Sequence, residues 1–377
     1  MRIPETMTRH YAQRFSSGKI GILIAFCVVI GTAGCFVMNA CGTLPLDSPE
    51  KTKLVVFEAG SLMVPFAQME KEFEAANQDI DVQFEAHGSI QVIRHVVELG
   101  ENVDVVAVAD YSLIPMLMYP SMMEDGNPYA DWYIEPAANQ LVLAYTEQSR
   151  YANEVNSNTW YDIIAREDVK LGLSDPRMDA VGYRTLMVLK LAESYYHDNQ
   201  ILQKAVTNSF TYPVSEVEID ESTVIKVPEL LEPADNHVVL RGASMQLLAL
   251  LHSNDVDYAF EYKSVALQQG LKYLELPPEI NLGDEAFAET YRTVRVKLDF
   301  RRFTSVDPEF EGIPIGYGMT IAANSAQPEA AVRFMQFVLG PDGQRIFLEN
   351  SHPPLVPAGC DDLEALPDEL RPLVRQE

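Results

Sequence analysis

Beyond its first 42 residues this chain contains a single cysteine, Cys360, out of four in 377 residues. An internal disulfide is therefore excluded in the remainder of the chain, and no spacing of cysteine and histidine is typical of a zinc site. Basic residues are also scarce, since 28 lysines and arginines face 55 aspartates and glutamates, for a formal net charge of −27. Such an acidic chain is a poor partner for nucleic acid.

The common catalytic signatures are absent as well. The sequence has no GxxxxGK phosphate loop, no HExxH motif and no paired CxxC motifs. The run Gly242-Ala243-Ser244-Met245-Gln246 is similar to a nucleophile elbow, but glycine does not occupy its last position. A serine-dependent enzyme stays open as an alternative, and no catalytic residue is assigned.

The first 42 residues predict a signal or lipoprotein leader. Four basic residues precede an uncharged run from Ile20 to Gly34, which is the layout of a signal peptide and predicts export to the extracytoplasmic face of the cell membrane. Extending the run through Met38 approaches the length of a membrane span, so an uncleaved anchor also stays open. Small residues precede Cys35 and Cys41, either of which is a candidate for lipidation. Residues 43–52 are expected to be a tether.

Strands alternate with helices along the rest of the chain. Strands are predicted at 54–57, 80–85 and 103–108, with helices between them, and the pattern resumes at strand 169–173 and helix 182–196. Such alternation predicts an α/β fold with parallel strands, whose carboxyl ends hold the ligand. The prolines and alternating acidic residues of 216–235 favour an edge hairpin or a surface loop.

Two lobes are expected for a chain of this length. The strands at 140–145 and 256–262 are predicted to be the two crossovers between them. The predicted division is lobe 1 at 53–140 and 262–357, lobe 2 at 141–261, and a C-terminal tail at 358–377.

Four helix starts are candidates for one shared binding site. Ser61, Ser89, Asp179 and Ser244 each stand where a turn opens a helix. A helix start presents unpaired amides and a positive dipole end, which together favour an anion. For any one of these residues the alternative is a simple N-cap, so the binding hypothesis depends on the set.

Several long segments give the chain a specific resemblance. They are Ala59–Leu62, Ala107–Pro115, Ala130–Tyr133, Asn139–Tyr145, Gly182–Arg184 with Leu186 and Met187, and Tyr262–Ala266. On these segments the chain resembles the extracytoplasmic tungstate/molybdate-binding proteins of ABC importers, particularly the archaeal-type family. The resemblance covers roughly residues 53–357 and implies a two-lobe, type II periplasmic-binding-protein-like fold with a ligand cleft between the lobes.

The resemblance also implies a ligand and a set of contacts. The ligand is a tetrahedral oxyanion, molybdate or tungstate, with no cofactor and no catalysis. The implied ligand-binding residues are Ser61, Leu62, Ser89, Asp179, Ala180, Val181, Ser244 and Tyr262. Asp179 stands where one family carboxylate can approach the metal of the oxyanion, but Ser244 replaces the second, a glutamate, and Val181 replaces a usual cysteine. Another oxyanion, such as sulfate or phosphate, is therefore an alternative ligand.

The same resemblance implies the partners. They are an ABC permease with its ATPase subunits, and the membrane through a lipid anchor or an uncleaved leader. A monomer is expected. Arg184 and Arg94 lie a turn or so inside their helices, which favours surface or interlobe salt bridges, and Asp110 is expected to order the turn into Ser112.

Overall fold

The computed structural model describes residues 50–220, 222–301, 303 and 307–376. The predicted leader, the lipidation candidates Cys35 and Cys41 and most of the tether lie outside these residues. The described α-helices are α1 (Met63–Ala76), α2 (Ser89–Val97), α3 (Trp160–Ile164), α4 (Ala180–Tyr196), α5 (Ile201–Ala205), α6 (Met245–Ser253), α7 (Lys263–Gln268), α8 (Ala288–Tyr291), α9 (Pro328–Leu339) and α10 (Pro341–Glu349).

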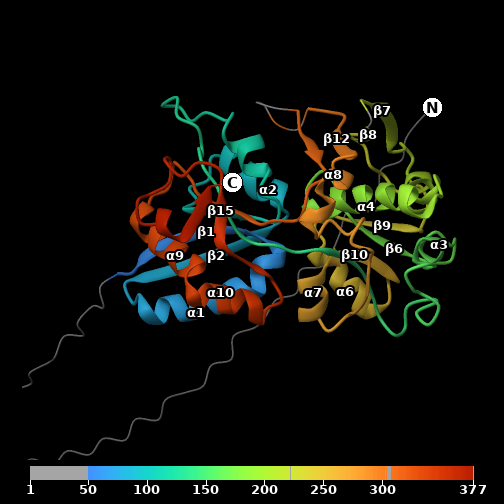
Figure 1. Cartoon of the computed structure of the whole chain (residues 1–377), viewed down its shortest axis with the longest axis horizontal. Coiled ribbons are helices and arrows are strands. Elements are labelled where there is room, and N and C mark those ends of the chain that lie inside the picture. The colour runs from blue at the N-terminus through green and yellow to red at the C-terminus, as the bar shows by residue number, and fades with distance from the viewer. Residues whose placement is uncertain (1–49, 221, 302, 304–306, 377) are drawn as a thin grey trace, which may run out of the picture. The chain divides into compact units, whose positions relative to one another are not determined.

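The first sheet has seven described strands in the order β16-β15-β4-β14-β3-β1-β2. β1 pairs in parallel with β2 and β3, as the alternation predicts, whereas β14 runs antiparallel between β3 and β4. α1, α9 and α10 pack together, and α2 packs on β1 and β3 (Figure 1). The strand bounds are β1 Thr52–Ala59, β2 Ile80–His87, β3 Val105–Val108, β4 Ile134–Ala137, β14 Gly318–Ile321, β15 Pro354–Cys360 and β16 Val374–Gln376.

The second sheet has five described strands in the order β11-β5-β10-β6-β9. β10, β6 and β9 are parallel, and β5 is antiparallel to β10. α4 lies on one side of this sheet, while α6 and α7 lie on the other (Figure 1). The strand bounds are β5 Leu141–Tyr145, β6 Leu171–Ser174, β9 Val238–Arg241, β10 Tyr258–Tyr262 and β11 Lys272–Glu275.

A third sheet of four described strands packs on α4 through β12, in the order β13-β12-β8-β7. β7 (Ser215–Ile219) and β8 (Ser222–Val227) form an antiparallel hairpin with β7 at the sheet edge, so the edge hairpin predicted from the acidic stretch is confirmed. β12 (Val294–Leu298) and β13 (Glu309–Glu311) complete the sheet.

The strand pairing differs from the predicted crossovers and lobe boundaries. β5 and β10 both lie inside the second sheet, where every residue of β10 is buried, as expected for a central strand. The chain leaves the first sheet after Ala137 and returns to it before Gly318, and these two connections pair with each other through Ala138 and Gly316. Residues 263–311 therefore add to the second and third sheets, and the predicted tail supplies β16 and the end of β15.

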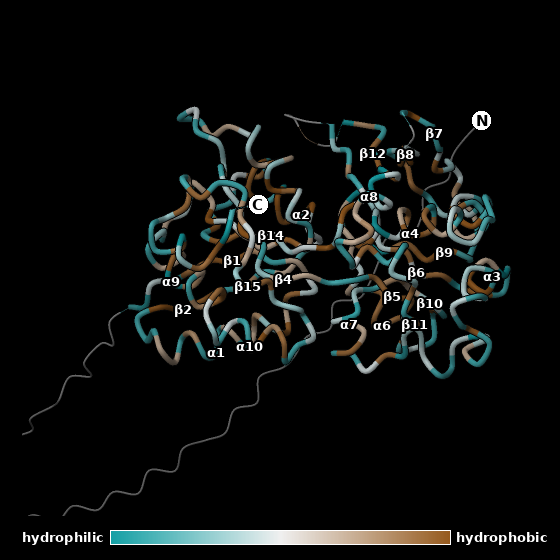
Figure 2. Tube along the Cα trace, viewed as in Figure 1, coloured by the Kyte–Doolittle hydropathy of each residue, from teal (hydrophilic) through white to brown (hydrophobic). Residues whose placement is uncertain are grey.

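The hydrophobic core follows the central strands. Leu54, Val56 and residues 105–108 in the first sheet, and Leu141–Ala144 and Tyr258–Tyr262 in the second, are almost fully buried. Figure 2 shows these strands as hydrophobic segments between more hydrophilic loops and outer helices. Within the described ranges, no helix combines the length and apolar composition needed to cross a membrane.

Candidate functional site

The predicted helix starts follow the ends of strands. β1 leads through a 3-10 turn, Gly60–Leu62, into α1, and β2 leads through Gly88 into α2. In the second sheet, β9 leads to α6 after Ser244, and a loop after β6 ends at Asp179, the N-cap of α4. These turns lie at the carboxyl ends of strands, which is where α/β sheets bind ligands.

Close contacts join the turns of the first sheet to those of the second. A Cβ atom added to Gly60 would lie 2.6 Å from Met245 Cγ, and one added to Gly88 would lie 2.5 Å from the carbonyl oxygen of Met178. Real Cβ atoms do not approach this closely, so a side chain at Gly88 would displace backbone, whereas one at Gly60 would have to move the Met245 side chain. The structure thus brings together the starts of α1, α2, α4 and α6.

The hydroxyls of Ser61 and Ser89 do not cap their helices. No side-chain cap bond is present at α1, at the turn before it or at α2. Both side chains are buried, and each hydroxyl accepts a hydrogen bond instead: Ser89 Oγ from the amide of Ala109 at 3.0 Å, and Ser61 Oγ from the hydroxyl of Tyr317 at 3.1 Å. The alternative of simple N-capping is therefore wrong for these two serines.

A one-way chain of hydrogen bonds ends at Ser61. Asn139 Oδ1 accepts from the amide of Gln140 at 2.9 Å, which fixes the orientation of the side-chain amide. Asn139 Nδ2 then donates to Ser264 Oγ at 2.8 Å and to the hydroxyl of Tyr317 at 2.9 Å. Because Tyr317 receives this bond and passes its own proton to Ser61, the Ser61 proton is left to point elsewhere.

Tyr262 receives its hydrogen bond from a buried arginine. Arg184 Nη1 donates to the Tyr262 hydroxyl at 2.6 Å and to the carbonyl oxygen of Ala109, while Nη2 lies 3.2 Å from Asp110 Oδ2. Asp110 Oδ2 also accepts from the hydroxyl of Tyr183 at 2.5 Å. Arg184 thus joins the end of β3 in the first sheet to the end of β10 in the second, which confirms the expected interlobe salt bridge.

Asp110 also has the local role expected from the sequence. Its Oδ1 accepts from the amide of Ser112 at 3.0 Å and from the Ser112 hydroxyl at 2.7 Å. The carboxylate therefore orders the turn after β3 with one oxygen while the other faces the tyrosine and arginine of α4.

Asp179 is occupied by hydrogen bonds within the protein. Oδ1 accepts from the amide of Val181 at 3.3 Å, which caps α4, and Oδ2 accepts from Ser174 Oγ at 2.7 Å and from the amide of Ser244 at 2.6 Å. Burial raises the pKa of the Asp179 carboxyl, and these donors oppose that shift. The carboxylate ties the start of α6 to the start of α4.

The Ser244 side chain forms a hydrogen bond with a different carboxyl group, that of Glu261. Glu261 is 1% exposed, and its Oε1 accepts from the amide of Tyr262 at 2.8 Å. Burial raises the pKa of Glu261 to about 8, Asp179 adds to the rise, and hydrogen bonds from the Tyr262 amide and the Ser244 side chain oppose it. Two buried carboxyl groups, those of Asp179 and Glu261, therefore lie close enough to interact at these turns.

The remaining predicted contacts, Leu62, Ala180 and Val181, are buried at these same turns. The sequence reasoning missed Asn139, Tyr317 and Glu261. Asn139 comes just before β5 and Glu261 lies near the carboxyl end of β10, in or beside segments already singled out, so their positions next to strand ends were the available signal. Tyr317 precedes β14, and nothing in its local pattern marks it.

Two buried glutamates make the protein less stable as the pH rises. Burial raises the pKa of Glu58 to about 8, and its Oε2 has no hydrogen-bond partner among the described residues. In the folded state Glu58 and Glu261 keep their protons until the pH approaches 8, whereas in the unfolded state they lose them above their ordinary pKa of 4.5. The free energy of unfolding therefore falls as the pH rises toward 8. Burial lowers the pKa of His352 to about 4, so this residue makes stability rise with pH. Its effect is confined to pH values below its ordinary pKa of 6.5.

Between pH 6.5 and 8 the free energy of unfolding is expected to fall by about 1–2 kcal/mol for each of the two glutamates. Urea denaturation at several pH values measures the slope, and Glu58→Gln is expected to remove about half of it. A free energy of unfolding that stays constant across this window, or an unchanged slope in Glu58→Gln, would contradict the assignment.

The described residues contain no group of three or more His, Cys, Asp or Glu side chains placed to hold a metal ion. The expectation that Asp179 approaches the metal of an oxyanion concerns the bound ligand, and it stays a prediction.

The fold and this arrangement define a class. A two-lobe α/β fold with polar groups gathered at strand ends between its sheets is that of the periplasmic binding proteins. The chain belongs to the family of bacterial extracellular solute-binding proteins, whose family model matches residues 54–350.

Relatives and solved structures narrow the comparison. The chain is 38% identical over 367 residues to the molybdate/tungstate-binding protein WtpA of Pyrococcus abyssi, covering 94% of this chain and 98% of that protein. The periplasmic molybdate-binding protein of Azotobacter vinelandii has a similar fold, with a TM-score of 0.50 at 15% identity over 79% of this chain and 98% of that one. The sulfate-binding protein SubI of Mycobacterium tuberculosis is similar too, with a TM-score of 0.52 at 12% identity over 81% and 87%.

Proposed function

We propose that this chain is the substrate-binding receptor of an ABC importer and that it captures a tetrahedral oxyanion, molybdate or tungstate. The protein binds its ligand without chemical change and presents it to a permease driven by ATPase subunits. The conclusion rests above all on the direction of three buried hydroxyl groups.

The hydroxyls of Ser61, Ser89 and Tyr262 all have their protons free. Each accepts a hydrogen bond from a protein donor, respectively the Tyr317 hydroxyl, the Ala109 amide and the Arg184 guanidinium. Among the residues that the structure describes, none accepts a hydrogen bond from any of the three. Burial also raises the pKa of Tyr262 well above its usual range, so its proton stays in place at neutral pH.

Three buried hydroxyl donors that have no acceptor among the described residues fit a ligand that can only accept hydrogen bonds. An oxyanion with four oxygens is such a ligand, and uncharged hydroxyl donors can hold it inside a protein whose net charge is −27. The raised pKa of Glu261 favours a protonated carboxyl, which repels a dianion less than a carboxylate does.

The preferred oxyanion is proposed from the relative rather than from the pocket. The 38% identity to a molybdate/tungstate-binding protein, over nearly the whole of both chains, supports those two anions. Sulfate stays the second candidate because Ser244 replaces the family glutamate and leaves Asp179 engaged by three donors.

Removing one donor is expected to weaken binding of the oxyanion. Ser61→Ala and Ser89→Ala should each cost about 1–3 kcal/mol of binding free energy, because a buried anion oxygen loses its partner. Calorimetric titration of the full chain with tungstate, in the presence of excess sulfate, measures the loss. Ser149→Ala is the matched control, since the buried Ser149 hydroxyl donates to the Asp257 carbonyl oxygen at 2.6 Å inside the second sheet's own loops.

The control should lower thermal stability and leave tungstate affinity unchanged. Wild-type affinity in both serine variants would refute the site. Tungstate binding abolished by sulfate in the wild-type chain would instead assign the site to sulfate.

We further propose that the leader exports the chain and holds it at the extracytoplasmic face of the membrane, through lipid on Cys35 or Cys41 or as an uncleaved anchor, and that the receptor acts as a monomer. Membership of the extracellular solute-binding family supports export. Mass spectrometry of the mature chain from its host membrane identifies the first residue and any lipid.

A further inference from the structure

Arg94 is a half-buried cation without a partner. The salt bridge expected from its place in α2 is not formed, because Arg94 pairs neither with Glu98, one turn further on, nor with any other described residue. Its Nε is buried and has no acceptor. The two terminal nitrogens also have no partner among the described residues, but they are not buried. A guanidinium drawn partly out of water without a carboxylate is suited to an anion that arrives from solution.

Contacts place Arg94 next to the seam where the turns of the two sheets meet. Gln91, one turn earlier on α2, donates from Nε2 to Met178 Sδ at 3.6 Å, and Met178 lies in the turn before α4. Residues three apart on a helix share a face, so Arg94 is the next side chain along from this contact. Figure 1 shows α2 on the side of the first sheet that is nearer to the second.

A second unpaired arginine approaches Met178 from the other sheet. Arg241 is the last residue of β9, and its exposed guanidinium donates only to the neighbouring carbonyl oxygen of Leu240, at 2.8 Å, among the described residues. A Cβ atom added to the next residue, Gly242, would lie 3.6 Å from Met178 Sδ. Arg94 and Arg241 therefore each lie beside a contact to the same thioether, one from each sheet.

These two charges are exceptional in their surroundings. The chain has a net charge of −27, so its long-range field repels a dianion. Arg177, which precedes Met178, is held by Asp175, with Nη2 2.5 Å from Oδ2, and is largely neutralised. Arg94 and Arg241 thus supply local positive charge beside the turns that carry the buried hydroxyl donors, and their planar forks match the oxygens of an oxyanion.

We propose that Arg94 and Arg241 form the entrance to the oxyanion site, where a tetrahedral dianion makes its first contact before it passes to the buried hydroxyls. The entrance rests on the proposed oxyanion function and adds to it the residues that capture the ligand. A charge at the rim of a site acts chiefly on the association rate. Loss of either arginine should therefore slow the binding of tungstate more than it speeds its release.

Stopped-flow intrinsic fluorescence of the full chain with tungstate measures both rates. Arg94→Gln and Arg241→Gln should each lower the association rate constant about threefold to tenfold at about 0.01 M ionic strength. The difference should shrink below about twofold at about 1 M, where the screening length is about 3 Å. Arg94→Lys keeps the charge and should associate at nearly the wild-type rate. Neither glutamine variant should lower the melting temperature, because neither guanidinium has a carboxylate to lose.

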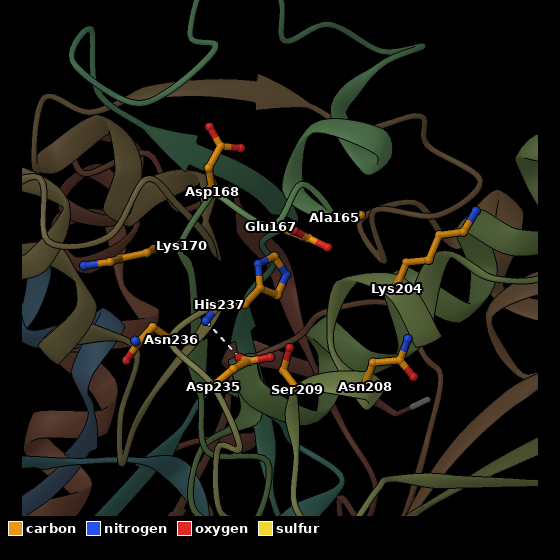
Figure 3. A pocket seen from close by; sticks show the side chains of 10 residues that line it. All are labelled: Ala165, Glu167, Asp168, Lys170, Lys204, Asn208, Ser209, Asp235, Asn236 and His237. Carbon is orange, nitrogen blue, oxygen red and sulfur yellow. Dashed lines mark hydrogen bonds between the residues drawn. The ribbon is translucent and has the colours of Figure 1, made fainter.

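Lys170→Gln is the matched control, since it removes a half-buried cation that has no ion pair among the described residues. Lys170 comes just before β6, whereas Arg241 ends β9, which runs parallel to β6, so the two lie at opposite ends of the second sheet. Figure 3 shows Lys170 at a separate polar cavity lined by the loops before β6 and β9 and by the end of α5. This variant should associate with tungstate as the wild type does.

Two results would overturn the entrance. One is an association rate that is unchanged in both arginine-to-glutamine variants, and the other is an equal fall in Lys170→Gln, which would assign the effect to net charge alone. A wild-type chain that binds no tungstate at equilibrium would instead refute the oxyanion function on which the entrance depends.

Discussion

Replacing Arg184 with methionine is expected to reduce tungstate affinity at least a hundredfold and to lower the melting temperature. Arg184 is 1% exposed, and its guanidinium donates a hydrogen bond to the Tyr262 hydroxyl at 2.6 Å. Its loss leaves the buried Asp110 carboxylate without its cation, and breaking a buried pair costs about 3–5 kcal/mol. It also frees the Tyr262 hydroxyl to turn its lone pairs toward the oxyanion.

A double-mutant cycle with Tyr262→Phe distinguishes positioning from general destabilisation. If Arg184 acts through the tyrosine hydroxyl, the double variant should bind tungstate about as weakly as Arg184→Met alone. The control is Arg150→Met, which breaks an ion pair with Asp257 at 2.6 Å from an arginine side chain that is 48% exposed. Calorimetry and thermal unfolding of all four variants provide the data. Fully additive losses of affinity would show that Arg184 does not position Tyr262.

Gly88→Ala is expected to lower oxyanion affinity by more than tenfold with little loss of thermal stability. The new Cβ would meet the carbonyl oxygen of Met178 at 2.5 Å, and a backbone atom in the turn before α4 cannot yield as a side chain can. The turn of the first sheet would then be pushed away from the turn of the second, which separates Ser89 from the other donors.

Two other glycines are matched controls for this variant. At Gly60 the added Cβ meets the flexible Met245 side chain at 2.6 Å, so Gly60→Ala should cost less affinity than Gly88→Ala. At Gly242 the nearest atom lies 3.6 Å away, which is an ordinary contact, and Gly242→Ala should bind normally. Equal affinities across the three variants would show that close approach of the two turns is not needed for binding.

The sequence was sufficient for the elements that depend on local pattern. The strands and helices around Ser61, Ser89, Asp179 and Ser244 begin and end near the predicted positions, because hydrophobic periodicity and glycine punctuation are local signals. All the predicted contact residues are buried, and their contact with a ligand stays a prediction.

What the sequence could not supply depends on pairing between distant segments. β10 is continuous and apolar whether it crosses between lobes or runs inside a sheet, so only its pairing with β5 and β6 reveals its place. The direction of hydrogen bonds at Ser61 depends likewise on Asn139 and Tyr317, which are far from it in the chain. No local pattern records which group donates to a hydroxyl.

The position of β14 has a consequence for the order in which the chain folds. This strand lies between β3 and β4, and Gly318 pairs with Val108, so the first sheet stays divided until the last part of the chain has been synthesised. The second sheet needs nothing beyond Glu275. Long-range pairing of this kind closes slowly, because the loop entropy is lost before the contacts form. The nascent chain should therefore complete the second sheet before the first, and the Tyr317 hydroxyl should reach Ser61 only when β14 takes its place between β3 and β4.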